Sequence, residues 1–278
     1  CDVVNDNFLT FSGGFGSISV GERFDAGAAM LSRLTAAGPM SEPDGGQLGV
    51  FYTADAENDM GSGNETHYAN NSMKAVYMSN VYSGFSFAVG YTPNTGETGS
   101  STDGLNPGVG DHGEYATHSD VLSVFGKYAM EMDGIGLELV YGQITGNSGP
   151  SGSSHYNDLD ESAYSAKVTY GNFAADYRKN EAGNSGRIKN GQDGNDEGTS
   201  ICGMYTMGNI GLGACNVETS FTDTSNLSNS STTRTYSAEY QLGGGVALGV
   251  VYFDVDQTAN GSTRTDADGL VSRLSIGF

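Results

Sequence analysis

Apolar residues recur at every second position in many short segments, and this alternation limits what the chain can fold into. In GFSFAVGYT (84–92), aromatic and aliphatic residues alternate with serine, alanine and glycine. The same pattern repeats in GIGLELVYG (134–142), AYSAKVTYG (163–171) and VALGVVYFD (246–254). A period of two is typical of a strand with one apolar face. The opposite face carries small and polar side chains, which are too small to build a buried core.

Short turns and long polar links alternate along the whole chain. The expected strands are 6–12, 15–22, 70–80, 83–92, 118–130, 133–146, 161–171, 172–181, 198–207, 210–221, 232–242, 245–256 and 267–278. Turns on one side and long loops on the other are typical of a transmembrane barrel. Closure pairs every backbone group, which lipid requires. The sequence therefore predicts an all-β fold, a transmembrane antiparallel β-barrel.

Charge and hydropathy exclude several classes of protein. The chain has 33 acidic and 12 basic residues, a net charge of -21, so we expect no nucleic-acid partner, because phosphate binding needs basic surface. No run of about 18 apolar residues is present, which excludes a membrane-spanning helix. No Ser/His or Asp/His group falls on adjacent inward positions, so we expect no enzymatic activity.

Both ends of the chain resemble one protein family. FLTFSGGFGSISVGERFDAGAAM (8–30) resembles the hairpin leading into the constriction loop of Gram-negative general diffusion porins, particularly the alphaproteobacterial type. GLVSRLSIGF (269–278) ends in Phe278, which looks like the signal of outer-membrane assembly. The resemblance covers essentially the whole chain. It implies a passive outer-membrane channel for small hydrophilic solutes, a homotrimer that contacts outer-membrane lipid and lipopolysaccharide.

The family barrel has sixteen strands, whereas about thirteen are visible here. Counting back from the C-terminus makes the strand before the longest link, 23–69, number five, and in the family the constriction loop follows strand five. We therefore expect residues 1–278 to be a single barrel domain lacking its first three strands, with 23–69 as the constriction loop. The alternative is a native thirteen-stranded barrel, although bacterial barrels have an even number of strands.

The pore-constriction residues are expected in this loop. By the resemblance it folds into the lumen, with Arg23 and Arg33 beside an acidic set: Asp25, Glu42, Asp44, Asp55, Glu57 and Asp59. Such carboxylates would raise the local cation concentration. The alternative is that they are solvated on an outward surface loop.

Strand parity also places charges on the pore wall. With the apolar face toward lipid, the inward residues are Lys74, Lys127, Lys167, Arg178 and Arg273, with Glu138, Asp176 and Glu239. On the lipid side a lysine or arginine would cost about 2–4 kcal/mol at the midplane. A basic wall facing an acidic loop predicts a transverse field and weak cation selectivity.

Metal and cofactor signals are weak. The clusters Asp193/Asp196/Glu197, Asp158/Asp160/Glu161 and Asp266/Asp268 offer oxygen ligands for Ca²⁺, but none has EF-hand spacing. Solvated loop acids are the alternative, and we expect no cofactor. The four histidines, at 67, 112, 118 and 155, are expected at the surface.

Two readings compete with a channel. A surface-exposed all-β adhesin or binding protein would need bulky apolar residues on the second face of its strands. A lipoprotein anchored through Cys1 is compatible with CDVV at the start, but it fits poorly with missing strands.

Two cysteines flank a turn in ICGMYTMGNIGLGACN (201–216). If GN at 208–209 is a two-residue turn, paired residue numbers sum to 417, so Cys202 lies opposite Cys215 in a non-hydrogen-bonded pair. Their Cα atoms would be about 4.5 Å apart, which a disulfide tolerates. We expect a lumen-facing disulfide near the short-turn end. Metal binding is not expected, because no second CxxC or nearby histidine is present.

Overall fold

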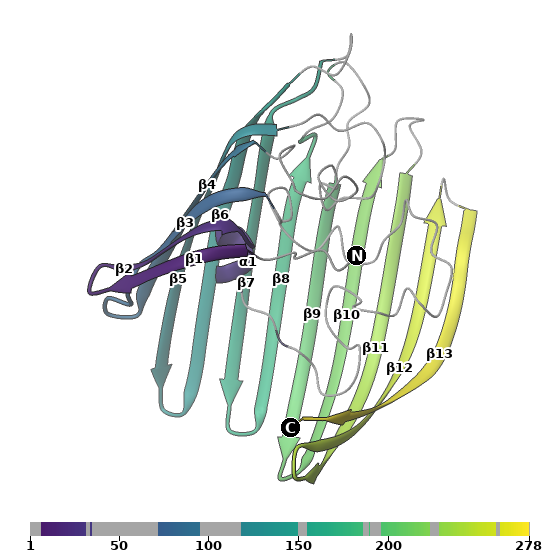
Figure 1. Cartoon of the computed structure of the whole chain (residues 1–278). Coiled ribbons are helices and arrows are strands. Elements are labelled where there is room, and N and C mark those ends of the chain that lie inside the picture. Colours follow the sequence, from purple (N-terminus) through teal and green to yellow (C-terminus); the bar gives the residue numbers. More distant parts are fainter. Residues whose placement is uncertain are drawn as a thin grey trace.

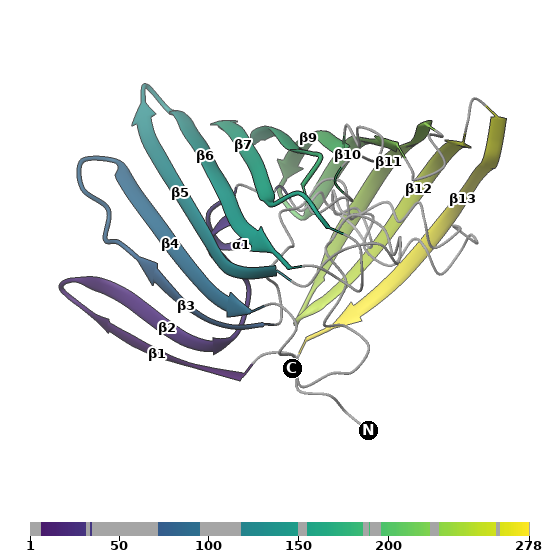
Figure 2. The ribbon, with the colours of Figure 1, turned by 90° about the horizontal axis from the view of Figure 1, so that it is seen from above.

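The described part of the chain is one curved sheet. The computed structural model describes residues 7–31, 34, 72–94, 118–149, 155–185, 189, 196–222, 228–259 and 262–277. Thirteen antiparallel strands follow one another in sequence order, and the sheet is open between β1 and β13 (Figures 1 and 2). The strands are β1 (Asn7–Gly13), β2 (Gly16–Glu22), β3 (Met73–Met78), β4 (Phe85–Asn94), β5 (His118–Met132), β6 (Ile135–Ser148), β7 (Leu159–Tyr170), β8 (Phe173–Gly183), β9 (Asp196–Met207), β10 (Ile210–Thr222), β11 (Ser228–Gly243), β12 (Val246–Ala259) and β13 (Ser262–Ile276).

Each of the thirteen expected strands is confirmed, with some shifted ends. The clearest differences are β11, which begins at Ser228 rather than 232, and β13, which begins at Ser262 rather than 267. These extensions are rich in serine and threonine, so they have no apolar alternation to mark them. Backbone pairing therefore continues beyond the apolar part of the strands, on the side of the long links.

The two faces of the sheet differ in chemistry as the alternation predicts. On β6, Leu139 and Tyr141 are 43% and 56% exposed on the outer face, whereas the intervening Val140 is buried on the concave face. Large exposed apolar side chains continue over the outer face of most strands. Such an area is unusual on a soluble monomer and is what a lipid-facing barrel requires. Among the described residues, no helix is both long and apolar enough to cross a membrane.

Aromatic residues gather at two levels of the outer face. Near the short turns, Phe85 contacts Tyr128 and Phe173 contacts Tyr205, each with ring centroids 4.4 Å apart. Toward the long links, Tyr164 lies beside Tyr177 at 6.0 Å and Tyr236 beside Tyr252 at 6.4 Å. Two aromatic bands flanking an apolar zone are the expected interfacial girdles of a membrane barrel.

The concave face is less uniformly polar than the sequence predicts. A helix, α1 (Ala26–Met30), lies on it and contacts β3, β4, β5 and β6 (Figure 2). Beneath it Phe125 and Ile144 are completely buried. The expectation of only small and polar inward residues is wrong there, because α1 covers that part of the wall. A smaller apolar cluster, Val251, Phe253 and Val255, lies on the inner face of β12.

A lysine scan of the two faces tests the orientation of the sheet. We expect Leu139→Lys on the outer face to lower the free energy of unfolding by about 2–4 kcal/mol, because the charge enters the apolar zone near its middle. Thr169→Lys is the control, since Thr169 lines a hollow of about 370 Å³ with Lys167 and Glu138. Guanidinium unfolding in phospholipid vesicles measures both. Equal destabilisation by the two variants would contradict a lipid-facing outer surface.

Candidate pore constriction

The chain that leaves β2 turns onto the concave face. We call residues 23–31 and 34 the entry segment. Its helix begins at Asp25, whose Oδ1 accepts a hydrogen bond from the Ala28 N–H at 2.8 Å, as an N-cap does. Beside the helix, Gly90 leaves room for the Ser123 hydroxyl on the wall, because a Cβ at this position would clash with Ser123 Oγ. The helix ends at Met30, with Leu31 as its C-cap.

Asp25 was predicted to line the pore constriction, but in the structure its side chain is not exposed to water. Its side chain is buried and caps α1, so its charge serves the fold of the entry segment. Spacing alone could not distinguish this capping aspartate from a pore-lining one. The other predicted constriction residues, Glu42, Asp44, Asp55, Glu57 and Asp59, lie outside the described residues, as do Arg33 and Phe278.

Lys74 is an inward residue, as parity predicts, but it is buried rather than open to the lumen. Its Nζ donates to the carbonyl oxygens of Arg23, at 2.5 Å, and Ser72, at 2.6 Å. One ammonium group thereby joins the chain where it leaves β2 to the chain where it enters β3. Arg23 itself donates to Ser19 Oγ and lies 4.8 Å from the centre of the Phe8 ring.

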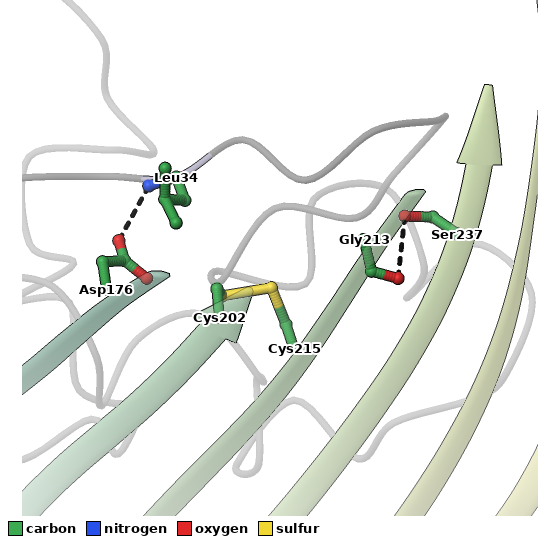
Figure 3. The surroundings of a disulfide bond; sticks show 6 residues. All are labelled: Leu34, Asp176, Cys202, Gly213, Cys215 and Ser237. Carbon is green, nitrogen blue, oxygen red and sulfur yellow. Dashed lines mark hydrogen bonds between the residues drawn. A yellow bond between two sulfur atoms is a disulfide. The ribbon is translucent and has the colours of Figure 1, made fainter. Parts of the chain in front are cut away.

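The far end of the entry segment reaches β8. The Leu34 N–H donates to Asp176 Oδ2 at 2.8 Å, although the two residues are 142 positions apart in sequence (Figure 3). The Leu34 side chain is buried with Cys202 and Cys215, and Ala174 packs against this cluster. Asp176 was predicted as a pore-wall charge, and the structure instead uses its carboxylate to hold the entry segment.

Cys202 and Cys215 lie opposite each other on β9 and β10, so the predicted pairing is confirmed. Their sulfur atoms form a disulfide, with Cα atoms 4.1 Å apart and both side chains on the concave face (Figure 3). The expected position near the short turn is wrong. Paired residues run from Met207 beside the turn to Glu197, and Cys202 is midway between them.

A row of alternating charges crosses the inner wall. Lys127 Nζ lies 3.3 Å from Glu138 Oε1, and both side chains are about a quarter exposed, at 22% and 25%. In register, Glu138 pairs with Lys167, and Lys167 pairs with Asp176. The sign therefore alternates from β5 to β8.

The described wall is mixed in charge rather than basic, which differs from the expectation of a basic wall. By register and burial, its inward cations are Arg23, Lys74, Lys127, Lys167, Arg178 and Arg273, and its inward acids are Asp25, Glu131, Glu138, Glu161, Asp176 and Glu239. Glu131 and Glu161 were not among the predicted wall charges, although both share strand parity with inward neighbours. Arg178 is buried, Arg273 is exposed, and Glu239 accepts a hydrogen bond from Gln241 Nε2 at 2.6 Å.

A second charged region, which sequence analysis did not identify, lies on the outer face beyond the tyrosine band. Lys179 contacts Glu181 at 2.5 Å and Glu197 at 3.2 Å. Arg234 contacts Asp254 at 2.9 Å and Asp256 at 3.0 Å. We call these residues, with Asp266 and Asp268, the outer rim. The sequence does indicate this region, because Asp254 and Asp256 share the strand parity of outward Tyr252.

The expected metal and histidine positions are only partly described. Within the described ranges, no three His, Cys, Asp or Glu side chains gather as a metal site requires. Asp193 lies outside those ranges, and Ca²⁺ at the acidic loops stays a prediction. His118 is buried rather than at the surface, and its Nδ1 lies 2.9 Å from Ser148 Oγ.

Solved porin structures share this fold. A porin refined at 1.8 Å is 18% identical, with a TM-score of 0.56 over 97% of this chain and 81% of that one. An anion-selective porin from Comamonas acidovorans is 12% identical, with a TM-score of 0.56 over 97% and 75% of the two chains. OmpT, an outer-membrane protein of Vibrio cholerae, is 13% identical, with a TM-score of 0.54 over 98% and 79%. At these identities the likeness concerns the fold alone.

The sequence itself also matches a family. A search of curated proteins found no significant match. The family model described as Gram-negative porin matches residues 2–272. Since this match spans nearly the whole chain, the chain belongs to the Gram-negative porin family and is a channel protein of the bacterial outer membrane.

Proposed function

We propose that this porin is a passive channel for small hydrophilic solutes and ions, with weak cation selectivity. The observation that carries the proposal is the entry segment, which lies on the concave face and is held there by Lys74 and Asp176. Chain inside a barrel with a largely polar wall narrows the aqueous path. Size and charge then decide what passes along this path.

Selectivity depends on where the net charge of -21 lies. The described wall carries balanced charges, which makes little net field. The excess acids include those of the outer rim and the predicted constriction residues Glu42, Asp44, Asp55, Glu57 and Asp59. Their field attracts cations, and screening over about 8 Å confines the effect to a narrow path and its mouth. An anion-selective porin has a similar fold, so charges rather than the fold must set the preference.

The outer rim supports a proposal about partners. Its carboxylates lie on the outward face beside the tyrosine band, and such aromatic bands sit at the level of the lipid headgroups. Carboxylate and phosphate oxygens are ligands for Ca²⁺, which would bridge the two anionic surfaces. We propose lipopolysaccharide as the neighbour of this rim, and a homotrimer as the assembly in the membrane, as the family resemblance implies.

Reversal potentials test the selectivity. In planar bilayers with a KCl gradient, we expect stepwise conductance and a potential that favours K⁺, with the preference weakening at high salt. Replacing the five predicted constriction acids by their amides should reduce the preference. The matched control is Asp254→Asn with Asp256→Asn on the outer rim, which should change it less. Preference for Cl⁻ in the wild type would contradict the proposal.

The mass of the protein in detergent tests the proposed homotrimer. Multi-angle light scattering in detergent, with the detergent contribution subtracted, should give three times the chain mass of 28.9 kDa. Unheated samples should also migrate more slowly on a denaturing gel than boiled ones. A monomeric mass in several mild detergents would refute the homotrimer while leaving the channel proposal intact.

A further inference from the structure

An apolar spot interrupts the polar inner wall of β8 to β11. The disulfide between Cys202 and Cys215 faces the lumen there, and hydroxyl residues such as Ser200 and Ser237 lie nearby on the same face. The Leu34 side chain covers this spot and is only 4% exposed. A leucine that enters a water-filled lumen gains by contacting apolar surface, and the disulfide with Ala174 supplies it.

A hydrogen-bond acceptor lies directly beside the apolar spot. Asp176 pairs in register with Cys202, so its carboxylate and the disulfide are neighbours on one face of adjacent strands. Asp176 Oδ2 accepts from the Leu34 N–H at 2.8 Å, and both groups are buried. The backbone and side chain of one residue are therefore held by two adjoining wall features (Figure 3).

The entry segment is also attached at its start and along α1. Lys74 holds the carbonyl of Arg23, and α1 packs on the wall from β3 to β6. Leu34 joins the entry segment to β8 and β9 through its backbone N–H and its buried side chain. It thereby ties the segment to the wall beyond the strands that α1 contacts.

We infer that Asp176 and the Cys202–Cys215 disulfide form a seat for Leu34, and that this seat sets how far the entry segment narrows the pore. The inference rests on the proposed channel function. It assigns Asp176 as a positioning residue, which acts through the segment it holds and not through its own charge in the solute path. The disulfide is then a wall surface for the segment as well as a link between two strands.

Two substitutions of Asp176 separate these roles. Asp176→Ala removes both charge and acceptor, whereas Asp176→Asn removes the charge and keeps an amide oxygen that the Leu34 N–H can use. We expect Asp176→Ala to raise single-channel conductance roughly 1.5-fold or more, because conductance grows with the open cross-section. Larger uncharged polyethylene glycols should also enter. Asp176→Asn should keep the wild-type conductance and polymer cut-off. Equal changes in both variants, or none in either, would overturn the seat.

Proteolysis of the folded protein supplies a readout that does not require conduction. We expect Asp176→Ala, which loses one hydrogen bond to a charged group, and Leu34→Ala, which loses a buried apolar side chain, each to speed tryptic cleavage after Arg33 roughly tenfold or more. Because both act on one attachment, the double variant should be cleaved little faster than the faster single variant. Ser237→Ala is the control, since its hydroxyl only meets the Gly213 carbonyl at 3.4 Å.

The outcomes distinguish the two proposals. Wild-type protein that is protected at Arg33 but does not conduct would refute the channel and keep the seat. Conducting protein whose cleavage is unchanged by Asp176→Ala and Leu34→Ala would refute the seat and keep the channel. Heat-dependent gel mobility establishes that each variant is folded, and if Asp176→Ala fails to fold, Leu34→Ala and Asp176→Asn carry the test.

Discussion

Lipid offers no hydrogen bonds to a polypeptide backbone, and the architecture follows from this constraint. In a membrane, each strand must be paired along both sides, and here every strand from β2 to β12 has two antiparallel neighbours. Pairing of this kind alternates side chains between two faces. One face must then suit lipid and the other water, which is the division between outward Leu139 and inward Glu138 on the same strand.

The inner face has its own constraint, because a segment that enters the lumen must be attached to a wall made largely of polar groups. Charges withdrawn from water need partners. Lys74 and Asp176 meet that need by binding backbone groups at the two ends of the entry segment. The Lys74 ammonium and one oxygen of the Asp176 carboxylate gain partners in this way, and the segment is positioned at the same time. Lys74 and Asp176, which were predicted as charges of the pore wall, thus hold the entry segment in place.

Most of the fold was predictable from the sequence. Alternation identified all thirteen strands and the lipid-facing side, and the GN turn gave the pairing of Cys202 with Cys215. These features are local, since period and turn length determine them. Strand ends were less predictable, because the serine-rich start of β11 pairs without an apolar pattern.

Strand parity predicted the site only in part. Parity shows that Lys74, Asp176 and Glu138 point inward, but it does not show what covers them. Burial of Asp25 under α1 and the hydrogen bond across 142 positions from Leu34 to Asp176 arise from tertiary structure. The sign of the wall was mispredicted for a related reason. The predicted wall charges left out Glu131 and Glu161, two acids that balance the inward cations on the same face.

Liposome swelling tests the central claim, that a polar-walled barrel narrowed from inside conducts hydrophilic solutes by size. Purified protein is reconstituted into vesicles, which are then diluted into iso-osmotic solutions of uncharged sugars of increasing mass. We expect fast swelling with a pentose, slower swelling with a disaccharide, and none with a large oligosaccharide. Vesicles that swell at equal rates with all of these sugars, or that do not swell with any, would contradict a channel narrowed from inside.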